Sequence, residues 1–161
     1  MGKLGIYLDT SVISFLFATD SPDFQGATHD FFENYASQYS LFISDIVLLE
    51  ISKNKDEHLR KEMLGVASGF GILKLEGSER INAIAANYIE SGVIPRKKVE
   101  DALHVAYATF HGIDIVLSWN FRHLANINKE HRIIIENKKM GYDYPLRLLS
   151  PLEVIDESDD D

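Results

Sequence analysis

The sequence predicts an α/β fold, a three-layer domain with a central parallel sheet. Short apolar segments alternate with longer segments of helical periodicity along the chain, which is the pattern of strand–helix–strand units. Strands separated by helices pair in parallel, and the helices then cover both faces of the sheet. The 161 residues are enough for one such domain, and no repeat or low-complexity linker divides them.

The first half of the chain is expected to contribute three strands and four helices. Thr10 and Ser11 can cap the first helix, Ser21-Pro22 begins the second, and Asp45 caps the third. The predicted strands are Gly5–Asp9, Leu41–Ser44 and Gly71–Leu75, and the predicted helices are Val12–Ala18, 22–35, Ile46–Lys53 and Glu57–Ala67.

The second half continues the alternation. Ser78 opens a helix that Gly92 closes, and Gly112 ends another helix that is apolar almost all round. The predicted helices are Ser78–Ser91, Val99–His111 and Phe121–Asn126, and the predicted strands are Ile113–Ser118 and Arg132–Glu136. The sequence thus predicts one domain over residues 1–155, followed by a disordered acidic tail at 156–161.

The composition excludes several classes of protein. The chain has no cysteine, which rules out a disulfide scaffold, a thiolate zinc site and a cysteine nucleophile, and makes a reducing cytoplasm the expected compartment. The longest apolar runs are far shorter than the ~20 residues of a membrane-spanning helix, and the N-terminal residues lack the pattern of a signal peptide. We therefore expect a cytoplasmic protein without membrane contact.

The net charge of −9 at first argues against a nucleic-acid partner, since phosphate binding requires Lys and Arg. The charge is unevenly placed, however. The last eleven residues hold six acids and no base, so the preceding 150 residues carry 19 acids against 16 bases. Affinity for a nucleic acid is then expected to be modest, and to depend on a metal ion, a dimer groove or a partner.

Two acids stand where the predicted topology brings side chains to one crevice, at the carboxyl ends of the strands. Asp9 ends the first strand, and its carboxylate is not required for capping because Thr10 and Ser11 can both cap the next helix. Glu50 lies in an otherwise apolar helical segment. It either faces the crevice or belongs to a short polar face with Lys53.

A third acid is one of two at the start of an apolar helix. Glu100 and Asp101 both lie in its first turn, where acids also favour the helix dipole, and the helical repeat does not decide which of them faces inward. Asn120 follows the strand Ile113–Ser118 and brings a further polar side chain to the same edge, unless it is an ordinary turn residue.

Several carboxylates in one crevice imply a cation. They repel one another unless a positive charge compensates them, and all-oxygen ligands favour Mg²⁺ or Mn²⁺ over zinc. Such a centre is suited to phosphoryl chemistry, because the ion supplies a nucleophilic water and neutralises charge on the phosphate. The residues therefore predict a metal-dependent phosphodiesterase or phosphatase.

These residues lie in four segments, Ile6–Ile13, Ile43–Ile51, Asp101–Ala108 and Val116–Phe121. The segments resemble the PIN-domain family, and VapC-like ribonuclease toxins in particular. They follow one another in the family's order and at its spacing, and the ending at Ser150–Glu153 is similar as well.

The resemblance implies a Rossmann-like fold, RNA cleavage with Mg²⁺ or Mn²⁺, a homodimer, and an antitoxin partner that covers the crevice. By position, Asp9, Glu50 and Asp101 would form the metal-binding and catalytic centre, and Ser11 would support Asp9. Asn120 stands where many members have a fourth acid. The alternative function is therefore a PIN module with weak or no activity that binds RNA or a protein partner.

For several other side chains the sequence allows both a structural and a functional role. A run of bases is typical of a solvated turn but can also contact the RNA backbone, and the candidates are Arg96, Lys97, Lys98 and Arg122. His104 is either a buried core histidine or a partner of Asp101. Trp119 is the one aromatic residue considered for stacking on a base, while the phenylalanines are expected in the core.

Overall fold

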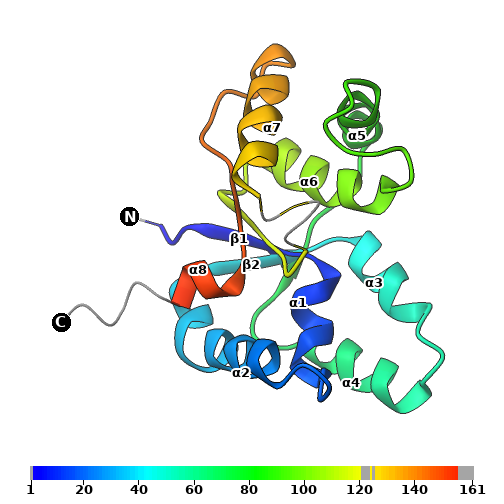
Figure 1. The fold of residues 1–161 in the computed structure, drawn as a ribbon, viewed down its shortest axis with the longest axis vertical. Helices are drawn as coiled ribbons and strands as arrows, with labels where there is room; N and C mark the ends of the chain where they lie inside the picture. The colour runs from blue at the N-terminus through cyan, green and yellow to red at the C-terminus, as the bar shows by residue number, and fades with distance from the viewer. Residues whose placement is uncertain (1, 121–123, 125, 156–161) are drawn as a thin grey trace.

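The computed structural model describes residues 2–120, 124 and 126–155, and it contains a five-stranded parallel sheet between two layers of helices (Figure 1). The strand order is β3-β2-β1-β4-β5, and each neighbouring pair is parallel. The predicted α/β fold is thus confirmed. The strands are β1 (Gly5–Leu8), β2 (Ser40–Ile43), β3 (Leu73–Lys74), β4 (Ile115–Leu117) and β5 (Arg147–Leu149).

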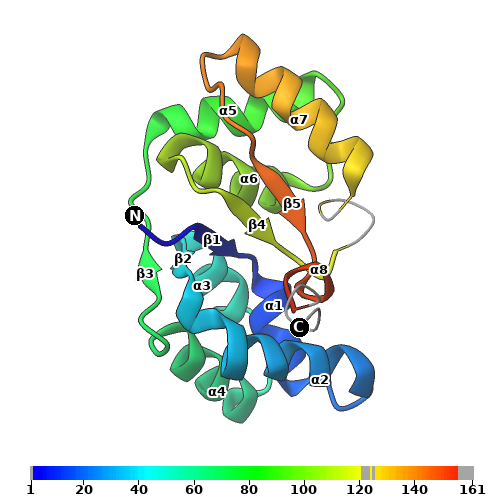
Figure 2. The same cartoon turned by 90° about the vertical axis from the view of Figure 1, so that its left-hand side faces the viewer.

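The helices form one layer on each side of the sheet (Figures 1 and 2). One layer contains α5 (Glu79–Glu90), α6 (Val99–His111) and α7 (Ile127–Lys139). The other contains α1 (Thr10–Ser14), α2 (Pro22–Asp30), α4 (Glu57–Ala67) and α8 (Pro151–Ile155), with the helical turns η1 (Phe15–Phe17), η2 (Phe31–Tyr35) and η3 (Ala36–Gln38). Helix α3 (Asp45–Ser52) packs against α1 and α4 and also reaches α6. In the described part of the chain, no helix combines the length and the apolar character needed to cross a bilayer.

The central strands β1 and β4 are buried along their whole length, because helices cover both of their faces. The chain runs outward from β1 to β2 and β3 through one helix layer, and then returns to β4 and β5 on the other side of β1. The direction of winding reverses between β1 and β4. Ligand crevices of open α/β sheets lie at such a switch point, outside the carboxyl ends of the strands. Asp9 and Ser118 follow these two strands.

The last predicted strand, Arg132–Glu136, is wrong, because these residues lie within α7. The run of three isoleucines resembles a strand, but Asn126 caps a helix by accepting hydrogen bonds from two backbone N–H groups. Ile133 and Asn137, one helical turn apart, are both fully buried. The fifth strand is instead β5, whose three residues are too few to show a period of their own.

Several boundaries also differ from expectation. Ser44, and not Asp45, caps α3, since its Oγ accepts from the N–H of Ile46 at 3.2 Å. Asp45 instead pairs with Lys74 at 3.0 Å. The first helix begins two residues early and ends at Ser14, and α8 was not predicted. Most of the predicted turn 121–126 and the predicted tail 156–161 fall outside the described residues.

Candidate active site

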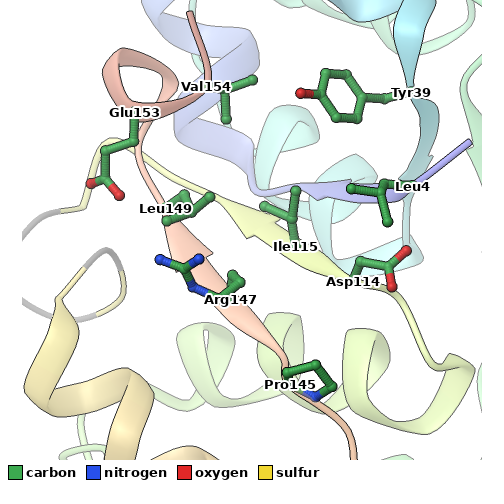
Figure 3. A pocket seen from close by; sticks show the side chains of 9 residues that line it. All are labelled: Leu4, Tyr39, Asp114, Ile115, Pro145, Arg147, Leu149, Glu153 and Val154. Atoms are coloured by element: carbon green, nitrogen blue, oxygen red, sulfur yellow. The ribbon is translucent and has the colours of Figure 1, made fainter. Parts of the chain in front are cut away.

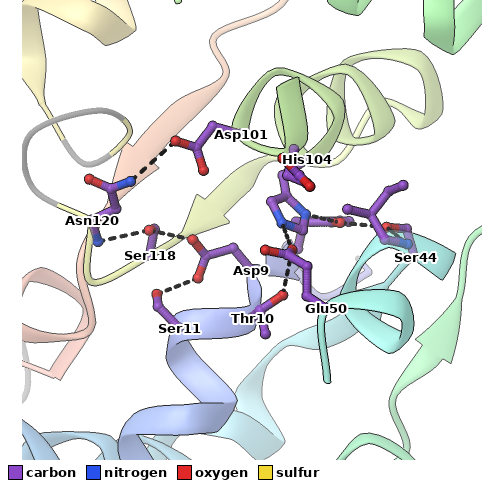
Figure 4. A network of polar contacts seen from close by, with 12 residues as sticks. Asp9, Thr10, Ser11, Ser44, Glu50, Asp101, His104, Ser118 and Asn120 are labelled. Atoms are coloured by element: carbon purple, nitrogen blue, oxygen red, sulfur yellow. Dashed lines mark hydrogen bonds and ion pairs between the residues drawn. The ribbon is translucent and has the colours of Figure 1, made fainter. Parts of the chain in front are cut away.

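Asp9 lies at the carboxyl end of β1 and is only 4% exposed. The capping position of α1 is Asp9 and not the predicted Thr10 or Ser11, which lie inside the helix, but the Asp9 side chain makes no capping hydrogen bond. Its carboxylate accepts hydrogen bonds from Ser11 Oγ at 2.5 Å and from Ser118 Oγ at 2.6 Å (Figure 4). Burial nevertheless raises the pKa of Asp9, against the opposing effects of His104 and the two serines. The protein therefore leaves this buried charge incompletely compensated.

Asp101, and not Glu100, is the acid of the α6 first turn that faces the crevice. Its Oδ2 accepts a hydrogen bond from Asn120 Nδ2 at 3.3 Å, while Glu100 is partly exposed and pairs with Lys53. Burial is the main cause that raises the pKa of Asp101, and repulsion by the carboxylates of Asp9 and Glu50 adds to it. The three acids are thus close enough to affect one another.

Glu50 is held by hydrogen bonds that both end on Oε1. Thr10 Oγ1 donates at 2.8 Å, and His104 Nε2 lies 2.6 Å away on the other side. Burial opposes ionisation of Glu50, but these contacts outweigh it and lower its pKa. The side chain, 29% exposed, therefore faces the crevice, which decides between the two orientations left open by the sequence.

His104 is a buried histidine, 2% exposed, and its ring contacts Glu50 and not Asp101. Its Nδ1 lies 2.6 Å from the hydroxyl of Tyr7, which in turn lies 2.6 Å from Ser44 Oγ. Burial raises the pKa of Tyr7 well above its usual value, so this hydroxyl keeps its proton. The sequence signal for this network is weak, since Tyr7 in a buried strand reads as an ordinary core residue.

The carboxylate of Asp9 lies between the Asp101 side and the Glu50 side of the site (Figure 4). Among the described residues, no group of three or more His, Asp or Glu side chains is arranged to hold a metal ion. Asp9 and Asp101 fit a hard cation by their chemistry, because their donors are oxygens and their raised pKa values mark negative charge that a cation would offset. Glu50 differs in that one of its two oxygens, Oε1, is already engaged by Thr10 and His104.

A family model described as the PIN domain matches residues 6–129. The chain belongs to the PIN-domain family. Its fold is similar to that of a chain in the crystal structure of VapBC2 from Rickettsia felis bound to a DNA fragment from their promoter. The TM-score is 0.59 and the identity 19%, over 91% of this chain and 98% of the other. No curated protein sequence matches.

This PIN domain also places a lysine near enough to Asp101 to interact with it electrostatically, and the sequence did not indicate this lysine. Lys129, in the first turn of α7, donates from Nζ to the carbonyl of Val93. Partial burial and repulsion by Arg132 lower the pKa of Lys129, while Asp101 is close enough to oppose that shift. It was missed because α7 was expected to be a strand that began only at Arg132.

The predicted basic residues differ in their distance from the site. Arg96, Lys97 and Lys98 are all exposed, and Lys98 is close enough to help lower the pKa of Asp101. Arg122 lies outside the described residues. Trp119 does not stack on a ligand from the surface, because it is 5% exposed, donates to Thr28 Oγ1 and packs against phenylalanines.

A separate cavity of about 270 Å³ in this PIN domain is lined by Leu4, Ile115, Arg147 and Val154, among others (Figure 3). Its polar groups are engaged in structural contacts: Arg147 pairs with Glu130, and Asp114 accepts from the N–H of Gly5. The converging carboxylates lie elsewhere, so the crevice at Asp9 remains the candidate active site.

Proposed function

We propose that this PIN domain is a metal-dependent endoribonuclease. The observation that carries the proposal is the pair Asp9 and Asp101, two carboxylates with raised pKa values at the switch point of the sheet. Membership of the PIN-domain family supports a nuclease. The choice of RNA as substrate rests on the sequence resemblance to VapC-like ribonucleases.

In this proposal Asp9 and Asp101 hold Mg²⁺ or Mn²⁺, with Glu50 beside them. When bound, the ion supplies a water of lowered pKa as nucleophile and offsets charge on the phosphodiester. Ser11 and Ser118 donate to the ionised form of Asp9 and fix its orientation. Asn120 donates to Asp101 and so would position this acid. Lys129 and Lys98 attract the phosphates that flank the scissile bond.

The same proposal includes a protein partner. The similar structure is that of VapBC2 bound to promoter DNA, which supports, at the level of fold, a toxin that pairs with an antitoxin. An antitoxin segment over the crevice would keep RNA away from Asp9 and Asp101. The first 150 residues have no surplus of bases, with 19 acids against 16, so a dimer groove that brings basic residues of two copies together, or the partner, would supply the RNA-binding surface.

The test is cleavage of an unstructured fluorescent RNA by wild type, Asp9→Asn and Asp101→Asn in Mn²⁺. Wild type should cleave, and each variant should lose about 100-fold or more in rate, because it removes charge that acts at the transition state. EDTA should abolish cleavage, and added Mn²⁺ should restore it. Equal cleavage by wild type and Asp9→Asn would mean a contaminating nuclease. RNA binding without any cleavage would instead favour the inactive PIN module.

A further inference from the structure

We propose that His104 is a positioning residue that orients Glu50 toward the metal-binding carboxylates. This inference rests on the proposed function and assigns a role to a histidine outside the acidic centre itself. His104 is not a catalytic residue in this proposal, because it touches neither the ion nor the RNA.

The geometry is a series of hydrogen bonds at the crevice (Figure 4). It links Tyr7 of β1 and Ser44, which follows β2, with residues of α1, α3 and α6. Ser44 contacts the Tyr7 hydroxyl, the hydroxyl contacts His104 Nδ1, and His104 Nε2 contacts Glu50 Oε1. Each of these three contacts is 2.6 Å long. This series of hydrogen bonds therefore fixes the imidazole ring of His104 at both nitrogens.

The direction of the last contact follows from the chemistry of its two groups. An ionised carboxylate can only accept, so Nε2 carries a proton and donates it to Glu50. Thr10 donates to the same oxygen. Within the described residues, Oε2 of Glu50 accepts no hydrogen bond from the protein. Oε2 is thus the oxygen left for an ion or for a water bound to it.

Positioning is needed because Glu50 has a flexible side chain on a short helix. Its side-chain torsions allow several staggered rotamers, and the side chain is 29% exposed. The ring of His104 is buried and held from the far side by Tyr7, so it provides a rigid donor. Carboxylates that bind metals are commonly oriented by such hydrogen bonds, whose loss costs about 10–100-fold in affinity or activity.

The decisive comparison is between His104→Gln and His104→Met. Glutamine keeps an N–H donor at the end of a side chain of similar reach, and methionine keeps the volume without a donor. The binding of Mn²⁺ is measured by electron paramagnetic resonance, together with the kcat and KM for RNA. We expect His104→Met to lose about 10–100-fold in Mn²⁺ affinity and in kcat, with little change in KM, and His104→Gln to stay close to wild type. His111→Gln, on the same helix but bonded to the Glu76 carbonyl, is the matched control and should equal wild type.

A double-mutant cycle with Glu50→Ala shows whether His104 acts through Glu50. In the Glu50→Ala background, His104→Met should cause almost no further loss of Mn²⁺ affinity, because the group that it orients is gone. Melting temperatures of all variants show that they are folded. A purely structural histidine would instead lower the melting temperature equally in His104→Gln and His104→Met.

The outcomes separate this inference from the proposed function. If wild type binds Mn²⁺ and Asp9→Asn does not, but His104→Met binds as well as wild type, the function stands and the inference is overturned. Additive losses in the cycle overturn it as well. If wild type neither binds Mn²⁺ nor cleaves RNA, the proposed function is wrong and the role of His104 falls with it.

Discussion

Helix α6 carries two buried polar networks that differ in charge. Its N-terminal half contributes Asp101 and His104 to the acidic crevice. Its C-terminal half contributes Thr109, which lies 2.8 Å from the Tyr88 hydroxyl and 3.1 Å from Asn137 Nδ2. Tyr88 also donates to Asn137 Oδ1, so this neutral network closes on itself between α5, α6 and α7.

The comparison shows where the molecule gains stability and where it keeps reactivity. In the described part of the chain, no buried side-chain nitrogen or oxygen lacks a hydrogen-bond partner, so both networks are satisfied in that sense. The neutral one contains no charge and holds three helices together. The acidic one contains Asp9 and Asp101, whose ionisation burial opposes. Hydrogen bonding alone therefore does not neutralise the crevice, and a cation would stabilise it.

The largest expected effect on stability comes from breaking the neutral network. Asn137→Leu leaves the hydroxyls of Tyr88 and Thr109 without their amide partner, which should lower the free energy of unfolding by about 2–3 kcal/mol. Urea denaturation measures this loss. Mn²⁺ affinity of the folded variant should equal that of wild type. Asn34→Leu, which removes an exposed contact to Asp30, is the control and should change stability by less than about 0.5 kcal/mol. Similar losses in the two variants would contradict the structural role.

Removing a charge from the acidic network should instead raise the free energy of unfolding when no metal is present. The pKa of Asp9 is raised in the folded state above its usual 3.8, so the folded protein binds this proton more tightly than the unfolded chain. The stability contributed by protonation is present below about pH 4 and is lost as pH rises through the raised pKa. Without metal, Asp9→Asn should therefore become more stable relative to wild type between pH 4 and 7, by about 1 kcal/mol.

Chemical denaturation of wild type and Asp9→Asn at several pH values, with chelator present, measures this difference. Added Mn²⁺ should stabilise wild type and not the variant, because ligand binding adds only to the state that binds it. A difference that does not change with pH would show that the charge of Asp9 is already compensated within the protein.

A smaller effect is expected from the lysine beside Asp101. Lys129→Met keeps much of the side-chain length and removes the charge, so the KM for RNA should rise about 3–10-fold with a smaller change in kcat. The slope of log affinity against log salt should fall by about one. Lys138→Met, exposed at the other end of α7, is the matched control. Equal effects of the two variants would mean that Lys129 acts only through net charge.

The smallest expected effect is a difference in RNA binding between variants of two neighbouring lysines in the basic turn. Lys98→Gln should weaken RNA binding about twofold, while Lys97→Gln should leave it unchanged, since Lys98 is among the main charges that act on Asp101 and Lys97 is not. Fluorescence anisotropy at low salt measures both. If the two variants bind alike, the turn is a solvated surface.

Much of the fold could be predicted because local signals were strong. Helices Glu57–Ala67 and Val99–His111 have the expected boundaries, and Gly112 ends the second with φ +68°, a conformation that favours glycine. The candidate site was predicted as far as topology determines it, since an acid after β1 must lie at the sheet's carboxyl edge. The strand predicted at Arg132–Glu136 is wrong because a run of isoleucines fits a strand and a buried helix equally well.

The sequence by itself determined the alternation of strands and helices that produces a parallel sheet, and it determined the elements that carry Asp9, Glu50 and Asp101. Only the tertiary structure decided which neighbours these acids meet. Asp101 rather than Glu100 faces the crevice, and Glu50 pairs with His104. Lys129, on the later helix α7, lies close enough to Asp101 to interact with its charge. The physical reason is that periodicity reports the face of an element, whereas these hydrogen bonds and charge interactions join side chains 19 to 109 residues apart in sequence.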